Sequence, residues 1–296
     1  MPYRQLTHLL DQRFDALSPE LQRAARWVRE HPAELGLQSM RQSAQAANVS
    51  PATMTRLAQA LGLDGFEAMR RPAMAAFARS VSRAEAPVGP GGAGGPASPL
   101  AQAQQANVAS IGERNPSGDL LAAAAHILRA RNVLFLGLRA SFGIAYHLHY
   151  TCDWLRPGTQ LASDPGGAWA DRLATLGADD LLVAVSQAPY TVQTVDAAQR
   201  AQASGVPVLV LTDSALSPLA RAATQTLLFD TASPAFFHSM TGAQALAEAL
   251  MDAVAQQGGD AVVQRLAARQ QQLQTARVYW DKPGRPAPPA KGPTAA

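Results

Sequence analysis

The sequence predicts two folded parts: an all-α N-terminal domain with a helix-turn-helix, joined to an α/β C-terminal domain built on a parallel sheet. Three observations predict this. Residues 1–83 show helical periodicity and helix caps, a Gly/Pro-rich linker follows at 84–99, and beyond it short apolar runs alternate with helical stretches. That alternation is typical of a parallel sheet covered by helices on both faces.

Length and composition narrow the class of protein. A chain of 296 residues has room for two domains, and 47% hydrophobic with 16% charged residues excludes global disorder. No apolar run reaches the ~18 residues of a transmembrane helix, and residues 1–15 are too charged for a signal peptide. The single cysteine, Cys152, excludes a disulfide framework and a Cys-rich zinc site. We expect a cytoplasmic protein with no membrane segment, metal or cofactor.

The net charge of +3 is unevenly distributed: +4 over residues 1–83, −5 over 84–259 and +4 over 260–296. Such asymmetry suggests different partners for different segments, and nucleic acid is a natural partner for the basic N-terminal part. A charge of +4 over 83 residues is also typical of ordinary solvated surface. Charge alone favours this second interpretation.

Helix caps mark the N-terminal helices. Ser18-Pro19 begins a helix that ends at His31-Pro32. Ser39–Gln42 fits the S-x-x-Q capping box at the start of another helix. Ser50-Pro51 begins a further helix, which ends at Gly62.

Residues 40–61 are expected to form the helix-turn-helix. Ala44 is small enough for two helices to cross closely, and Asn48 accepts the positive φ that the tight turn needs. Val49 is expected to pack the turn into the core. The buried stripe of the second helix comprises Met54, Leu57 and Leu61.

The outer face of that second helix carries short, polar or cationic side chains, as entry into a DNA major groove requires. These residues are Ala52, Thr53, Thr55, Arg56 and Gln59. The Arg56 guanidinium can bond guanine edges or phosphate, and the Ser50 hydroxyl at the helix N-terminus can contact phosphate. The alternative is a capped helical hairpin with a solvated face, since helix-turn-helix patterns have many false positives.

Residues 17–69 resemble the N-terminal domain of the RpiR/MurR family of bacterial transcriptional regulators. The resemblance is carried by Ser39 to Ala44, Val49 to Thr53, Arg56, and Leu61 to Phe66, which match the pattern S-x-x-x-x-A … V-S-x-A-T-x-x-R-x-x-x-x-L-G-[FL]-x-G-F. It implies that Ser50, Thr53 and Arg56 face DNA.

The C-terminal part contains four clear strand candidates and one weak one. The clear candidates are 132–137, 181–185, 207–211 and 226–229, and the weak one is 159–162. Helices are expected at 100–113, 119–130, 141–155, 168–176, 191–204, 216–222 and 241–257. We assign 100–258 to this domain, 259–280 to a C-terminal helix and 281–296 to a disordered tail.

Ligands of parallel α/β sheets bind beyond the carboxyl ends of the strands. Two of these ends carry hydroxyl side chains where a helix begins, at Gly137–Ser141 and at Ser186–Thr191. The turn after the next strand is Thr212-Asp213-Ser214. Free N–H groups and the helix dipole favour an anion at such helix starts.

The expected effector-binding residues are Arg139, Ser141, Ser186, Gln187, Tyr190 and Thr191. His238 is a further candidate for the neighbourhood of this pocket. For Ser141 or Ser186 taken singly, a helix N-cap is the safer interpretation. No dinucleotide-binding or P-loop glycine motif is present.

Residues ~105–256 resemble a SIS (sugar isomerase) domain, through Asn132–Ser141, Asp180–Thr191 and Gly205–Ala220. The resemblance implies a five-stranded parallel sheet, dimerisation and binding of a phosphorylated sugar that alters DNA affinity. The chain departs from the family pattern where Arg139 replaces a glycine and Ala188-Pro189 replaces a Ser-Gly pair. Since Arg139 can pair with phosphate or carboxylate, we expect a small acidic effector, with sugar phosphates among the candidates.

The combined prediction is a DNA-binding transcriptional regulator with no catalytic residues: an all-α helix-turn-helix domain joined to a SIS-like, doubly wound α/β domain. A homodimer, or a larger homo-oligomer, would present two recognition helices to palindromic operator DNA. The alternatives are a SIS-fold sugar-phosphate isomerase and an effector-independent DNA-binding dimer. Isomerisation needs a positioned base, and Glu113 and Glu248 are the only glutamates in 100–258.

Overall fold

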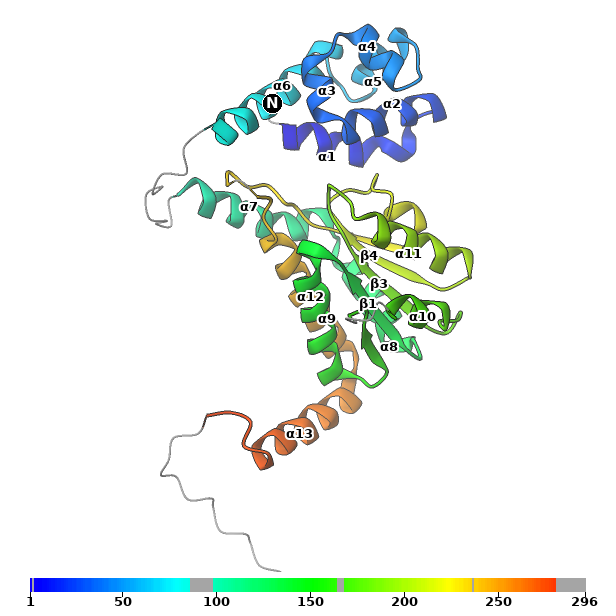
Figure 1. Cartoon of the computed structure of the whole chain (residues 1–296), viewed down its shortest axis with the longest axis vertical. Coiled ribbons are helices and arrows are strands. Elements are labelled where there is room, and N and C mark those ends of the chain that lie inside the picture. The colour runs from blue at the N-terminus through cyan, green and yellow to red at the C-terminus, as the bar shows by residue number, and fades with distance from the viewer. Residues whose placement is uncertain (2, 86–97, 164–167, 236, 281–296) are drawn as a thin grey trace, which may run out of the picture.

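The structure, a computed structural model, describes residues 1, 3–85, 98–163, 168–235 and 237–280. A helical domain lies at one end of the molecule, and a domain with a central sheet lies beside it (Figure 1). The expected segments 84–99 and 281–296 fall mainly outside the described residues. The helix before the first segment ends at Glu85, and the helix after it begins at Pro99.

The N-terminal domain is entirely helical, as predicted. Its elements are α1 (Tyr3–Arg13), η1 (Phe14–Ala16), α2 (Pro19–Glu30), α3 (Pro32–Leu37), α4 (Met40–Ala46), α5 (Pro51–Ala60) and α6 (Phe66–Glu85). They enclose a core to which α1, α2, α5 and α6 all contribute buried side chains.

The tight turn between α4 and α5 forms as the sequence predicts. Ser39 and Gln42 make the reciprocal capping box that begins α4. Asn48 takes a φ of 52°, in the left-handed region that asparagine tolerates. The Val49 N–H then donates to the Ala44 carbonyl at 2.9 Å, which closes the turn.

The C-terminal domain is α/β. Its strands are β1 (Val133–Gly137), β2 (Thr159–Leu161), β3 (Leu181–Val185), β4 (Val208–Thr212) and β5 (Gln225–Leu228). Its helices are α7 (Pro99–Arg114), α8 (Ser117–Arg129), η2 (Arg139–Ser141), α9 (Phe142–Leu155), α10 (Trp169–Ala174), α11 (Val192–Ala203), η3 (Ala220–Ala222), α12 (Thr241–Gln257) and α13 (Gly259–Thr275).

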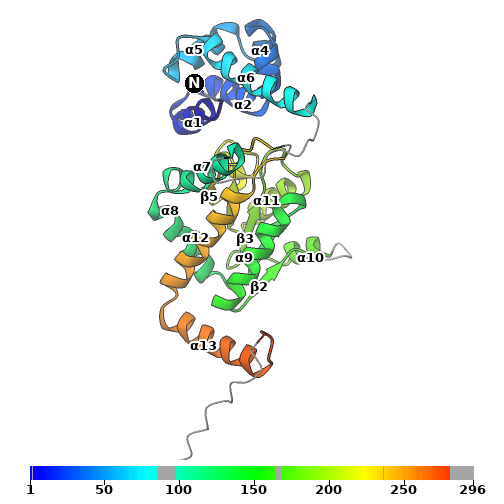
Figure 2. The same cartoon turned by 90° about the vertical axis from the view of Figure 1, so that its left-hand side faces the viewer.

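All five strands are parallel and lie in the order β2-β1-β3-β4-β5. Every residue of β1, β3 and β4 is buried, which explains why these strands are uninterrupted apolar runs in the sequence. Val133 and Phe135 pack toward α8, α9 and α12, whereas Leu134 and Leu136 pack toward α10 and α11. Figures 1 and 2 show these helices on the two faces of the sheet.

The five expected strands are confirmed, including the weak candidate at 159–162. The helix expected at 216–222 is wrong, because only the short turn η3 forms there. Leu216 instead packs into the core of the helical domain, so its apolar side chain serves a contact between domains. Within the part of the chain that the structure describes, no helix is long and apolar enough to cross a membrane.

Candidate DNA-binding surface and effector site

The expected recognition helix is α5. The Ser50 hydroxyl accepts the Thr53 N–H at 3.1 Å and caps the helix, and Pro51 occupies its first turn. Met54 and Leu57 are fully buried and fix α5 against the domain core. The rest of the helix surface is thereby turned outward.

Most of the residues predicted for the outer face lie there. Ser50, Ala52, Arg56 and Gln59 are exposed, and Thr55 is half-buried. Thr53 is fully buried, which corrects its predicted place on the outer face. Its hydroxyl is engaged within the domain, so its position cannot be inferred from helical spacing alone.

Glu20, near the start of α2, reaches two of these predicted residues. The Thr53 hydroxyl donates to Glu20 Oε1 at 2.7 Å, and Arg56 Nη2 donates to Glu20 Oε2 at 3.2 Å. Arg56 Nη2 also lies 3.3 Å from the Thr53 hydroxyl oxygen. The hydrogen bond from Thr53, together with the charge of Arg56, holds the pKa of Glu20 below its usual value.

Glu20 is a neighbour of the predicted DNA-binding residues that the sequence analysis missed. In the sequence, Glu20 is only an acidic residue in the first turn of a helix. Such residues are common because a negative charge there interacts favourably with the helix dipole. It reaches Arg56, 36 positions away in the sequence, because α2 and α5 pack together. No local sequence signal reports that contact.

The residues predicted to bind an effector lie at the carboxyl ends of neighbouring strands. Gly137 at the end of β1 pairs with Val185 at the end of β3, and Val185 pairs with Leu211 of β4. The loops that follow these strands therefore leave the sheet side by side. A Cβ at Gly137 would lie 2.5 Å from the Ser141 carbonyl oxygen, so glycine allows the turn into η2 and α9.

Arg139 stands in a backbone conformation that favours glycine, with a φ of 55°. This explains physically why the family pattern has a glycine at this position. The Arg139 side chain is exposed, and among the described residues no carboxylate forms an ion pair with it. No described acidic residue therefore occupies its guanidinium.

Ser141 and Gln187 link two of the loops. The Ser141 hydroxyl donates to Gln187 Oε1 at 2.8 Å, and both side chains are buried. Ser141 makes no side-chain cap to α9, so the capping interpretation does not explain its hydroxyl. Gln187 Nε2 lies 2.9 Å from His238 Nε2, so His238 lies beside these predicted residues. Burial lowers the pKa of His238, which favours its neutral form.

The loop from Ser186 to Thr191 is closed on itself. The Thr191 N–H donates to the buried Ser186 hydroxyl at 3.4 Å, and a cis peptide bond joins Ala188 and Pro189. The Tyr190 hydroxyl turns toward the next loop and donates to Asp213 Oδ1 at 2.9 Å. Asp213 is therefore part of the same edge, although sequence reasoning named only the turn that contains it.

A separate cavity of about 470 Å³ lies between α10 and α11. Trp169, Leu173 and Arg200 are among its lining residues. It contains none of the residues predicted to bind the effector, and sequence periodicity gives no sign of it.

Comparison with known proteins identifies both parts of the chain. Residues 4–80 match the helix-turn-helix domain of the rpiR family, and residues 126–253 match the SIS domain. The sugar isomerase domain of an RpiR transcription factor from Sphaerobacter thermophilus is 27% identical, with a TM-score of 0.55, and the match covers 58% of this chain and 96% of that one.

A second solved structure shares the fold of nearly the whole chain. The Vibrio vulnificus NanR protein, solved in complex with ManNAc-6P, is 21% identical, with a TM-score of 0.59, and the match covers 92% of this chain and 98% of that one. A comparison with proteins of curated function found no significant match to the chain. The chain therefore belongs to the RpiR family, with an rpiR-type helix-turn-helix domain followed by a SIS domain.

Proposed function

We propose that this protein is a transcriptional regulator that binds operator DNA and whose SIS domain senses a small anionic metabolite. The observation that carries the proposal is the exposed face of α5. It presents Arg56, Gln59 and Ala52 on a helix of the rpiR-type domain, and α5 lies on the side of that domain away from the sheet (Figures 1 and 2). A duplex can reach this face without meeting the sheet domain.

The proposed DNA contacts divide by chemistry. Arg56 reads a base edge or binds phosphate, and Ser50 with the free N–H groups of the α5 N-terminus meets a phosphate. Thr55 and Gln59 line the same face. Thr53 serves the surface indirectly, because its buried hydroxyl positions Glu20 beside Arg56.

The proposed effector site is the edge formed by the loops after β1 and β3. Hydroxyls of Ser141, Ser186 and Thr191 lie where α9 and α11 begin, and Arg139 adds a positive charge at the surface. Gln187 and Tyr190 complete the proposed set. NanR was solved with the phosphorylated sugar ManNAc-6P, which makes sugar phosphates the first compounds to test.

The proposed assembly is a cytoplasmic homodimer, or a larger homo-oligomer built from such dimers. Two recognition helices related by two-fold symmetry match a palindromic operator. The effector then changes operator affinity only by the difference in its own affinity for the two states of the protein.

Selection of duplexes from a random pool on the full chain tests DNA binding and defines the operator sequence in the same experiment. Arg56→Ala should weaken binding to the selected duplex by ~1–3 kcal/mol if Arg56 reads a base. Arg200→Ala, which removes an exposed arginine from α11, is the matched control and should leave the dissociation constant unchanged. Failure of the pool to yield any enriched duplex would contradict the proposal.

A thermal-shift screen of the full chain tests the effector. Sugar phosphates are compared with the same sugars lacking phosphate and with small carboxylic acids. A ligand at 100 times its Kd should stabilise the protein by ~2.7 kcal/mol. Stabilisation by the phosphorylated compounds alone is the expected result. Turnover of a sugar phosphate by the purified protein would point instead to an isomerase.

A further inference from the structure

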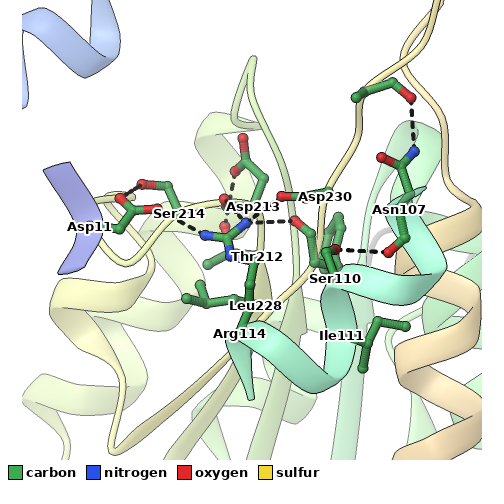
Figure 3. Close-up of polar contacts among 12 residues, drawn as sticks. Asp11, Asn107, Ser110, Ile111, Arg114, Thr212, Asp213, Ser214, Leu228 and Asp230 are labelled. Carbon is green, nitrogen blue, oxygen red and sulfur yellow. Dashed lines mark hydrogen bonds and ion pairs between the residues drawn. The ribbon is translucent and has the colours of Figure 1, made fainter. Parts of the chain in front are cut away.

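A largely buried polar cluster joins the helical domain to the sheet domain, and Figure 3 labels its members other than Arg29. We call it the interdomain cluster, and its members are Asp11 of α1, Arg29 of α2, Arg114 of α7, Asp213 and Ser214 after β4, and Asp230 after β5. It contains two cations and three anions from both domains. Such groups are costly to bury unless each is paired, so their contacts show how the two domains fit.

Arg114 connects the two domains through its two terminal nitrogens. Nη2 lies 2.8 Å from Asp11 Oδ2 in the helical domain, and Nη1 lies 2.7 Å from Asp230 Oδ1 in its own domain. Nη1 also donates to the Asp213 carbonyl at 3.1 Å. The side chains of Arg114 and Asp11 are only 7% and 8% exposed, so this ion pair is well shielded from water.

Arg29 makes the reciprocal connection from the helical domain. Its Nε donates to the Ser214 hydroxyl at 3.0 Å, and its Nη2 donates to the Asp213 carbonyl at 3.1 Å. The Ser214 hydroxyl donates in turn to Asp11 Oδ1 at 3.2 Å. Burial lowers the pKa of Arg29, but the charges around it, first those of Asp11 and Asp213, together raise it above its ordinary value, so the guanidinium stays charged.

Leu216 adds an apolar contact beside these polar ones. It follows the turn after β4 in the sheet domain, yet it is buried with the core residues of the helical domain. Directional hydrogen bonds around such an apolar contact favour one orientation of the two domains over others.

The cluster also reaches the proposed effector loop. Asp213 Oδ1 accepts the Tyr190 hydroxyl at 2.9 Å, while Asp213 Oδ2 lies 3.9 Å from Arg29 Nη2. Burial raises the pKa of Tyr190, so its hydroxyl remains a donor. One carboxylate thus contacts the effector loop with one oxygen and the DNA-binding domain with the other.

We propose that the interdomain cluster is a latch that holds the helix-turn-helix domain in one orientation, and that the Tyr190–Asp213 hydrogen bond makes the latch respond to the effector loop. The coupling to DNA rests on the proposed function. An anion bound at the loop repels the Asp213 carboxylate and competes for the Tyr190 hydroxyl. It therefore favours the released state, in which the recognition helices no longer have a fixed placement. Binding DNA then costs them more orientational entropy, so the affinity for DNA falls.

The latch itself is tested without DNA. Asp11→Asn combined with Arg29→Gln removes both charges that the helical domain contributes. Asp11→Asn keeps the side-chain volume, and Arg29→Gln keeps a polar side chain that is shorter than arginine. Small-angle scattering of the full chain should then give a larger radius of gyration at an unchanged oligomeric state. Asp15→Asn removes a similar charge from an exposed position of the same domain and should leave the radius as in the unaltered chain.

The coupling is tested on a duplex selected with the unaltered protein. The double variant should bind it roughly tenfold more weakly, within the range typical of coupling between two sites. Tyr190→Phe keeps the ring and removes only the hydroxyl, so it should weaken binding a few-fold. Because it acts through Asp213 and Arg29, it should have no further effect when added to Arg29→Gln.

The outcomes separate the two proposals. An unchanged radius in the double variant would overturn the latch, whatever the DNA measurements give. A larger radius with unchanged DNA affinity would overturn the coupling, as would a full effect of Tyr190→Phe in the Arg29→Gln background. If no duplex binds the unaltered chain, the proposed function fails, while the radius still decides on the latch. Circular dichroism spectra verify that each variant is folded.

Discussion

Single side chains set the chemistry of the proposed DNA surface, and Glu20 is the least expected of them. Its carboxylate binds the very guanidinium that is proposed to contact DNA. The pair is exposed, with 58% of the Arg56 side chain accessible to solvent, so it contributes little to stability. Its consequence lies in binding, because a DNA phosphate must compete with Glu20 for Arg56.

Glu20→Gln should therefore strengthen binding to unrelated duplexes by a few-fold. The substitution removes a negative charge near the DNA backbone and frees Arg56 for any phosphate, which weakens discrimination. Affinity for the selected duplex should rise less, so the ratio of specific to non-specific affinity falls. Fluorescence anisotropy at two salt concentrations measures both. Glu34→Gln, an exposed acid on α3, is the control, and an equal effect there would show a general charge effect only.

Helices and strands are positioned by contacts that begin and end them, and Asp180 is an example. It precedes β3, its side chain is 1% exposed, and it accepts hydrogen bonds from Arg131, the Asn132 backbone and side chain, and the Gly177 N–H. The hydrogen bond from Arg131 is the largest cause that holds the pKa of Asp180 well below its usual value. Asp180 thereby ties the start of β3 to the start of β1.

Asp180→Asn should lower the free energy of unfolding by ~1.5–3 kcal/mol at pH 7, the range for hydrogen bonds to a charged group. Because folding depresses the pKa, this stabilisation is present above the unfolded value of about 3.9 and is lost as pH falls toward the folded value. The difference between the two proteins should therefore shrink below about pH 4. Urea unfolding at pH 7 and at low pH measures it. Asp179→Asn, the exposed neighbour, should show no such loss.

The sequence predicts elements well where local rules decide them. The capping box at Ser39, the left-handed Asn48 and the buried strands follow from backbone geometry and from apolar runs of strand length. Prediction from the sequence is wrong where a residue distant in the chain determines the position of a side chain. Thr53 is an example, because its hydroxyl donates to Glu20 of another helix. The helix predicted at 216–222 is wrong for the same reason, because the partners of Leu216 lie in the other domain.

The whole chain joins a basic domain to an acidic one, and part of that charge split serves the contact between them. Arg29 of the helical domain faces Asp213 of the sheet domain, in the direction of that split. The pairs Arg114–Asp11 and Arg221–Glu30, the latter at 3.4 Å, run in the opposite direction. Sequence asymmetry suggested external partners for each segment and could not reveal this internal pairing. The positions involved are up to 191 residues apart, beyond any spacing rule.

A fixed domain orientation has a consequence for the operator of the proposed dimer. Two helix-turn-helix domains held in a fixed orientation by the dimer fit half-sites at one separation and on one face of the duplex. Five base pairs inserted between the half-sites of a selected palindrome turn one half-site by about half a turn of the ~10.5-base-pair repeat, so binding by the unaltered protein should be lost. Ten inserted base pairs restore the face but not the separation, and binding should remain weak.

The latch variant should respond differently to the same duplexes. Asp11→Asn combined with Arg29→Gln releases the helix-turn-helix domains from their fixed orientation. The duplex with ten inserted base pairs should then regain affinity relative to the original palindrome, whereas the duplex with five should not. Anisotropy titrations of both proteins on the three duplexes measure this. Only a helix-turn-helix domain held in place by the rest of its own chain can be sensitive to the separation of the half-sites. If the two proteins tolerate the ten-base-pair insertion equally, the contact between the domains does not persist on DNA.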